Sequence, residues 1–229
     1  MTDPRPLAVV CVSGGMDSAV TAALASADHR LAFLHGNYGQ RTQAKELACF
    51  QRLADHYAAE RRLVVDFTSL EAIGGSSLTD PRLPVREGAP IAGVVPTSYV
   101  PFRNAHLLSA AVSWAEVLGA PAVFVGAVSE DSSGYPDCRP EFYRAFQEAV
   151  RHGTRPETEI RILTPVIAMS KAEIVRRGVA LGVPFEMTWS CYRAQERACA
   201  LCESCLLRLR GFAEAGVPDP IPYRPLPVA

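Results

Sequence analysis

Short apolar runs alternate with helical patterns along most of the chain, and this alternation constrains the fold more than any other feature. Strands that alternate with helices pair in parallel, because each helix carries the chain back to the same edge of the sheet. We therefore predict a doubly wound α/β fold with a mostly parallel sheet, whose ligands bind at the carboxyl ends of the strands. The predicted strands are 7–12, 30–36, 61–67 and 122–128, and the predicted helices start near Asp17 and span 42–59, 104–118 and 141–152.

Residues 164–182 predict the end of a further strand followed by a helix. Ser170 stands at the expected N-cap and Glu173 at the third helical position, which is the capping-box pattern. Residues 74–101 are rich in Gly, Pro and Ser, and we expect them to form a loop longer than a simple connection needs.

The composition indicates one globular domain with a small appendage, because 229 residues that are 48% hydrophobic can bury a sizeable core. The formal net charge is only -1, so the basic footprint of a duplex nucleic-acid binder is missing. The chain has no run of about 18 apolar residues and no apolar signal region near its start. We expect a cytoplasmic protein with neither a membrane partner nor a strong nucleic-acid footprint.

The segment SGGMDS (13–18) leaves the first predicted strand and enters the first predicted helix. Adjacent glycines allow positive φ angles, so that successive N–H groups can converge on an anion, and the helix N-terminus adds further N–H groups. The segment is neither a Walker A loop nor a GxGxxG fingerprint, and a plain tight turn is the alternative.

SGGMDS resembles the pyrophosphate loop of the PP-loop ATPases. The resemblance implies an adenine nucleotide alpha hydrolase-like fold and cleavage of ATP between its α and β phosphates. Asp17 is expected either to cap the helix or to hold Mg²⁺. The residues assigned to nucleotide binding are Val12, Ser13, Gly14, Gly15, Met16, Asp17, Ser18 and Ala19.

Four of the seven cysteines fall close together, at Cys191, Cys199, Cys202 and Cys205. Four thiolates at this spacing can close tetrahedrally on Zn²⁺ and leave no open position, so the predicted role is structural. An iron–sulfur cluster is the alternative because it also takes four cysteines, and we expect zinc because no redox motif accompanies them. We predict a catalytic domain over 1–186 and a small helical zinc subdomain over 187–229.

Further strings occur in a distinctive order: YGQR (38–41), SSLT (76–79), YVPFRN (99–104), SGYPDCR (133–139), TPV with Lys171, and SCY (190–192). Together with SGGMDS and the cysteine spacing, they resemble the 7-cyano-7-deazaguanine synthase family from about residue 7 to residue 216. The resemblance implies that 7-carboxy-7-deazaguanine, ammonia and ATP give the nitrile by way of an adenylated carboxylate and an amide. It also implies a homodimer.

The strings supply candidate roles for individual side chains. Arg41, Arg103 and Lys171 are candidate cations for phosphate or for the substrate carboxylate. Tyrosine can stack on a purine-like ring, and Asp137 or Asp131 suits its donor face. The candidate catalytic residues are Asp17, Ser18, Arg103, Lys171 and Cys138, the last as a candidate nucleophile. The candidate substrate residues are Tyr38, Gln40, Arg41, Arg103, Asn104, Asp131, Tyr135, Asp137 and Arg139.

The chain departs from the family pattern at several positions. Asn37 stands in place of Asp, Thr42 in place of His, and Phe102 in place of the glycine of VPGRN. In SEDSSGYPDCR, serine replaces the usual aromatic residue at Ser132. We expect Phe102 and the lost aromatic ring to reshape the substrate pocket. A related enzyme that acts on another deazapurine or on a macromolecular acceptor is the alternative. A nucleotide sensor without activity is disfavoured because the loop keeps Asp17 and both serines.

Overall fold

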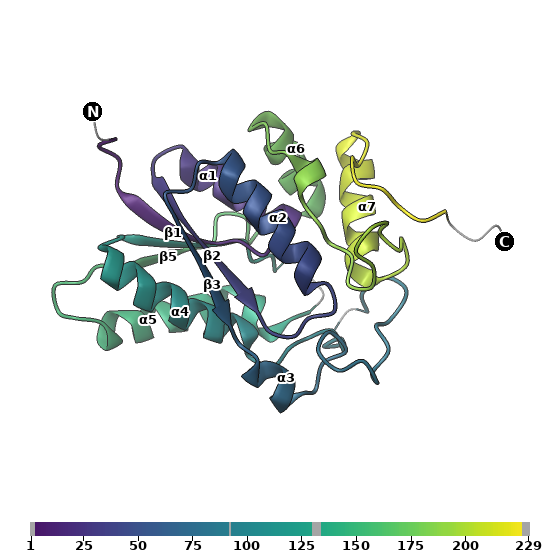
Figure 1. Ribbon diagram of the computed structural model, residues 1–229, viewed down its shortest axis with the longest axis horizontal. Helices are drawn as coiled ribbons and strands as arrows, with labels where there is room; N and C mark the ends of the chain where they lie inside the picture. The colour runs from purple at the N-terminus through teal and green to yellow at the C-terminus, as the bar shows by residue number, and fades with distance from the viewer. Residues whose placement is uncertain (1–2, 92, 130–133, 226–229) are drawn as a thin grey trace.

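The computed structural model describes residues 3–91, 93–129 and 134–225. Five strands in these residues form one parallel sheet in the order β3-β2-β1-β4-β5 (Figure 1). The strand at the centre is β1, and its residues from Ala8 onward are buried. The strands are β1 (Leu7–Cys11), β2 (Arg30–Asn37), β3 (Arg61–Asp66), β4 (Ala122–Val125) and β5 (Arg161–Leu163).

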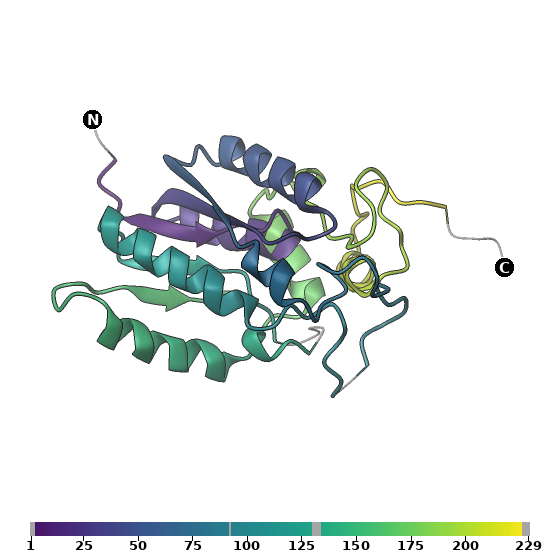
Figure 2. The same cartoon turned by 60° about the horizontal axis from the view of Figure 1, so that its bottom comes forward.

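Helices cover both faces of this sheet (Figure 2). One core lies under α1 (Met16–Ser26), α2 (Gln43–His56) and α6 (Lys171–Ala180), and a second lies under α4 (Arg103–Leu118) and α5 (Pro140–Gly153). Successive residues of a strand point to opposite faces, so Val10 packs into the first core and Val9 into the second. The predicted doubly wound α/β class is confirmed.

One predicted strand end was wrong by more than a residue. β4 stops at Val125 instead of residue 128, because its neighbour β1 pairs with it only as far as that residue. The strand predicted to end at the start of 164–182 is β5, which ends at Leu163, and 164–169 form tight turns closed by backbone hydrogen bonds. The predicted capping box at Ser170 and Glu173 is confirmed, since each side chain meets the other residue's backbone N–H.

The remaining elements are short or lie near the C-terminus. Residues 74–101 contain no helix or strand in their described part, as predicted, and the one-turn helix α3 (Ser69–Ile73) just before them was not predicted. α7 (Glu203–Ala215) follows the cysteine segment. No helix in the described ranges combines the length and the apolar character that a membrane crossing requires.

Close packing between α6 and α7 joins the C-terminal segment to the sheet (Figure 1). Gly211 of α7 lies so near α6 that a Cβ atom at this position would be 2.7 Å from the Cβ of Lys171. One turn earlier, Arg208 is buried and forms an ion pair with Asp219 at 2.8 Å, while it also donates to Thr188 Oγ1 at 2.7 Å. This packing therefore requires a residue without a Cβ atom at position 211, and it requires the Asp219 carboxylate to neutralise the buried Arg208 guanidinium.

Removal of the Asp219 charge is expected to destabilise the fold. Asp219→Asn leaves the buried Arg208 guanidinium without its counterion, at a cost of about 3 kcal/mol in the free energy of unfolding. Urea unfolding followed by tryptophan fluorescence measures this. The matched control is Asp55→Asn, which breaks the exposed pair with Arg62 and should cost less than about 1 kcal/mol. Equal losses in the two variants would contradict the prediction.

Candidate active site and cysteine cluster

A cavity of about 250 Å³ opens at the carboxyl ends of β1, β2 and β4. This is the edge at which ligands of parallel sheets bind. Its walls come from the SGGMDS loop, the first turn of α4, the segment around Tyr135, the start of α6 and residues 189–192. Segments far apart in sequence therefore share one site.

The SGGMDS loop is shaped by one glycine in a left-handed conformation. Gly14 has a φ of +85°, and a Cβ atom at this position would lie 2.7 Å from the carbonyl oxygen of Glu46. Glycine is therefore required both by the backbone angle and by the close approach of α2. α1 begins at Met16 with Gly15 as its N-cap, so Asp17 lies in the first helical turn and does not cap the helix.

The end of β4 presses on the loop from the other side. A Cβ atom at Gly126 would lie 2.8 Å from the backbone nitrogen of Ser18. The two loop serines are also linked, with 3.2 Å between Ser13 Oγ and Ser18 Oγ, and Ser18 Oγ donates to the Gly15 carbonyl at 2.9 Å. These contacts fix the shape of the loop from both sides.

Asp17 and Lys171 form an ion pair at the floor of the cavity. The distance from Lys171 Nζ to Asp17 Oδ2 is 2.7 Å, and the lysine side chain is only 10% exposed. The other carboxylate oxygen, Oδ1, is buried and has no hydrogen-bond partner among the described residues. A buried oxygen of this kind indicates a missing ligand such as an ion or a water molecule.

Arg103 also lines the cavity and lies among tyrosines. Its Nη1 donates to Tyr38 Oη at 3.1 Å, and the guanidinium lies 5.4 Å from the centre of the Tyr38 ring. Tyr135 Oη donates to Ser98 Oγ at 2.9 Å and lies 3.3 Å from Tyr192 Oη. Within the described ranges, no carboxylate forms an ion pair with Arg103. Such a half-buried cation is suited to an anionic ligand.

The structure brings most of the predicted site residues to the cavity. From the loop these are Val12, Ser13, Gly15, Met16, Asp17 and Ser18, and from elsewhere they are Tyr38, Arg103, Asn104, Tyr135, Cys138 and Lys171. Gly14 does not line the cavity but faces α2 on the other side of the loop, and Ala19 is buried in the core. Asp131 lies outside the described residues.

Other predicted substrate residues do not line the cavity. Arg41 donates to the backbone carbonyls of Ser77, Asp80 and Leu83, so its guanidinium fastens the 76–83 segment to the start of α2. Gln40 is buried and accepts from the backbone N–H of Tyr38.

Arg139, another predicted substrate residue, is exposed just before α5. Its guanidinium lies away from the cavity lining.

Asp137 holds the start of α4. Its Oδ2 accepts from the Asn104 backbone N–H, and Asn104 Nδ2 donates back to its carbonyl, both at 2.9 Å. The carboxylate is buried and does not line the cavity. This geometry favours a positioning role for Asp137 over direct contact with a substrate base.

Cys138 lines the cavity as a thiol. Burial and the neighbouring Asp137 carboxylate raise the pKa of Cys138 to about 11. Because the reactive form of cysteine is the thiolate, a nucleophilic role is disfavoured at neutral pH.

Sequence reasoning missed several residues of the cavity, namely His35, Glu46, Trp189 and Arg208. His35 Nδ1 lies 2.8 Å from the Val12 carbonyl oxygen, so this nitrogen carries the proton and Nε2 is an acceptor. Burial lowers the pKa of His35 and keeps the ring neutral. Glu46 stands in the first turn of α2, five residues after the YGQR segment, and this position close behind a predicted site segment was the available signal.

The predicted effect of Phe102 on the pocket was wrong. Its side chain is 58% exposed, packs edge-on against Phe142 with 6.0 Å between ring centres, and does not line the cavity. Its φ of +58° is left-handed, which explains in physical terms why glycine suits this position. The change to phenylalanine therefore strains the turn before α4 and leaves the cavity walls intact.

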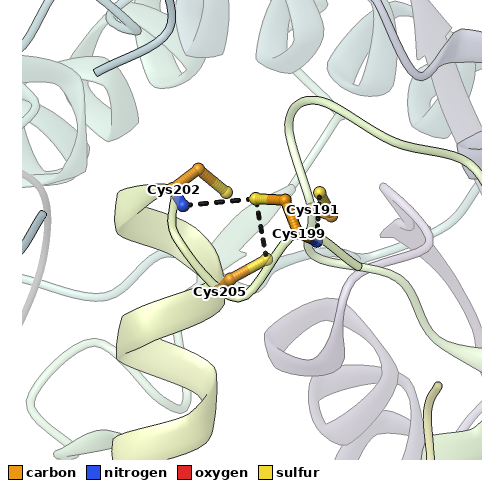
Figure 3. Close-up of side chains that lie close together, drawn as sticks. All are labelled: Cys191, Cys199, Cys202 and Cys205. Carbon is orange, nitrogen blue, oxygen red and sulfur yellow. Dashed lines mark hydrogen bonds between the residues drawn. The ribbon is translucent and has the colours of Figure 1, made fainter. Parts of the chain in front are cut away.

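The four cysteines meet in the segment before α7 and in its first turn (Figure 3). All four are buried, and their sulfur atoms lie within 4.8 Å of one another. Cys199 Sγ and Cys205 Sγ are 3.9 Å apart, close to the roughly 3.8 Å that tetrahedral Zn–S bonds impose. The donor set therefore fits a closed four-thiolate metal site.

Comparison with known proteins agrees with this geometry. The model of the queuosine biosynthesis protein QueC family matches residues 7–216. The 7-cyano-7-deazaguanine synthases of Chlorobaculum parvum and Chlorobaculum tepidum are 58% and 59% identical over 222 residues, which are 96% of this chain and 97% of each relative.

Among solved structures, the U34-tRNA thiolase NcsA from Methanococcus maripaludis with its [4Fe-4S] cluster has a TM-score of 0.51 at 12% identity. The match covers 84% of this chain and 61% of that protein, and it shows a shared fold alone. Because the family model spans nearly the whole chain and close relatives match it from end to end, the chain belongs to the QueC family of queuosine biosynthesis proteins.

Proposed function

We propose that this protein is an ATP-dependent ligase that converts 7-carboxy-7-deazaguanine and ammonia to 7-cyano-7-deazaguanine. The observation that carries the proposal is a single cavity in which a phosphate-type loop with Asp17 and Lys171 faces Arg103 among three tyrosines. The close relatives are named for this product.

Activation of the acceptor carboxylate is the first chemical requirement. A carboxylate is a poor electrophile, and transfer of AMP from ATP turns one of its oxygens into a leaving group. The N–H groups at the start of α1 and the Lys171 ammonium would bind the phosphates and stabilise the negative charge that develops on pyrophosphate.

A magnesium ion fits the same corner of the cavity. Asp17 Oδ1 is a buried carboxylate oxygen without a partner among the described residues, and carboxylate oxygens are the ligands that Mg²⁺ prefers. When bound there, Mg²⁺ would neutralise phosphate charge. Lys171 holds the other oxygen and thereby fixes the direction of the carboxylate.

The acceptor is assigned to the part of the cavity around Arg103. Arg103 would pair with the carboxylate of 7-carboxy-7-deazaguanine, and the rings of Tyr38, Tyr135 and Tyr192 would enclose the heterocycle. Their buried aromatic surface excludes water, which protects the activated carboxylate until ammonia attacks. A second ATP would adenylate the amide oxygen with release of pyrophosphate, and loss of AMP, which carries that oxygen, and of a proton gives the nitrile.

Further parts of the proposal rest on sequence and family. They are zinc as the metal of the cysteine cluster, a homodimer, a cytoplasmic location, and a division into 1–186 and 187–229. A nucleic-acid partner is not part of the proposal, because the formal net charge is only -1.

The ligase activity is tested with purified protein, 7-carboxy-7-deazaguanine, ammonium and Mg-ATP. Mass spectrometry is expected to show the amide and then the nitrile, with AMP formed in parallel. Lys171→Gln should lower kcat by about 10²- to 10³-fold, because it removes a cation from the developing phosphate charge. The control is Lys45→Gln, which changes the only other lysine of the chain. Absence of both products with the unmodified protein would overturn the proposed function.

Cys138 is expected to act as a neutral thiol. Cys138→Ala should lower kcat by less than about tenfold, because only a weak contact with Asn104 is lost. Alkylation of Cys138 by iodoacetamide should be slow at pH 7.5 and accelerate as the pH approaches 11, where the thiolate forms. A covalent adduct of the substrate on Cys138 at neutral pH would contradict this.

The cysteine cluster is expected to bind about one zinc ion per chain. Metal analysis of Cys205→Ser should show a lower zinc content, and its melting temperature should fall because α7 loses its anchored first turn. Cys49→Ser, at a buried cysteine outside the cluster, should keep the zinc content. Iron with visible absorption in place of zinc would contradict the assignment.

A further inference from the structure

Glu46 presents a fixed carboxylate to the cavity. Oε1 accepts a hydrogen bond from Thr42 Oγ1 at 2.6 Å, and Oε2 accepts one from Gln40 Nε2 at 3.1 Å. Both partners are buried, with exposures of 2% and 4%. The side chain is thus locked by two groups that come from the segment just before α2.

The hydrogen-bond partners define what Glu46 can bind. Both neighbours act as donors, which suits an ionised carboxylate, and each oxygen keeps a second lone pair. No lysine or arginine forms an ion pair with Glu46 in the part of the chain that the structure describes. A ligand in contact with it must therefore offer hydrogen-bond donors, and two adjacent donors would satisfy both oxygens.

The other carboxylates near the cavity are placed for other contacts. Asp17 is paired with Lys171 through Oδ2, and its unpartnered Oδ1 is the oxygen assigned above to Mg²⁺. Asp137 accepts from the Asn104 backbone through Oδ2, and although its Oδ1 has no partner among the described residues, Asp137 does not line the cavity. A structural role at the start of α2 would explain why a glutamate stands in the first turn of this helix. It does not explain why Glu46 also lines the cavity, together with Tyr38, while two buried donors hold its carboxylate in one direction.

The proposed substrate carries matching groups at its two ends. Its carboxylate is attached to the five-membered ring, whereas its adjacent donors, N1–H and the 2-amino group, lie on the far edge of the six-membered ring. We propose that Glu46 accepts both of these hydrogen bonds while Arg103 binds the carboxylate, so that Glu46 selects the 2-amino-4-oxo ring. This inference rests on the proposed function and assigns the base-reading role to a residue other than Asp137 or Asp131.

The geometry also gives Thr42 a part in this selection. Its hydroxyl sets the direction of Glu46 Oε1, so Thr42 is a positioning residue at the place where the family pattern has histidine. Thr42→Val keeps the shape of the side chain and removes the donor.

The test measures binding and turnover of 7-carboxy-7-deazaguanine and of its analogue without the 2-amino group. The unmodified protein should prefer the parent compound by at least about 30-fold in kcat/KM. Glu46→Gln should raise the KM of the parent about 100-fold, leave the KM of ATP within about threefold, and reduce the preference below about threefold. Thr42→Val should shift the preference in the same direction by about tenfold. The control Glu60→Gln, at the start of β3 and far from the cavity, should leave all values unchanged.

The outcomes separate the inference from the proposed function. If the unmodified protein acts on the parent compound but Glu46→Gln and Thr42→Val keep its preference, the role of Glu46 is overturned and the function stands. An increase in the KM of ATP instead of the acceptor would also overturn it. If the unmodified protein neither binds nor converts the parent compound, the proposed function fails and the inference fails with it. Calorimetric binding of both compounds gives the same comparison independently of turnover.

Discussion

The contact between Asp17 and Lys171 is the interaction on which the cavity depends. It joins residues that are 154 positions apart, and it closes the gap between the first turn of α1 and the first turn of α6. Neither helix could move along the sheet without separating a nearly buried pair of charges, which is costly. The positions of the SGGMDS loop and of the Lys171 ammonium are therefore set together.

Three glycines allow this arrangement by the absence of a side chain. Gly14 lets α2 approach the loop, Gly126 lets the end of β4 reach α1, and Gly211 lets α7 lie on Lys171. Each contact would be shorter than 3.0 Å if a Cβ atom were present. The cavity is thus built by backbone segments that approach one another closely, and the functional side chains are added to this frame.

Local sequence patterns made the fold, the SGGMDS loop and the cysteine cluster predictable. Alternating strands and helices indicated the parallel sheet, SGGMDS indicated the loop, and the cysteine spacing indicated the cluster, because each depends on residues near one another in sequence. Side-chain direction was harder to predict. Arg41 belongs to a motif, yet its guanidinium binds backbone carbonyls.

Glu46 shows the opposite case. It looks like an ordinary first-turn glutamate, and its place in the cavity wall depends on how α2 packs against β2. The direction of Phe102 likewise depends on a left-handed backbone angle that residue type alone does not indicate.

The position of the cysteine cluster on α7 has a mechanical consequence. Cys202 caps this helix and Cys205 lies in its first turn, while Gly211 touches Lys171 farther along the same rod. Six residues of α-helix span about 9 Å and bend little, so a displacement of the cysteine end of α7 would also displace Gly211 against Lys171. The cysteine cluster therefore influences the position of Lys171 through α7, although none of its four cysteines lines the cavity.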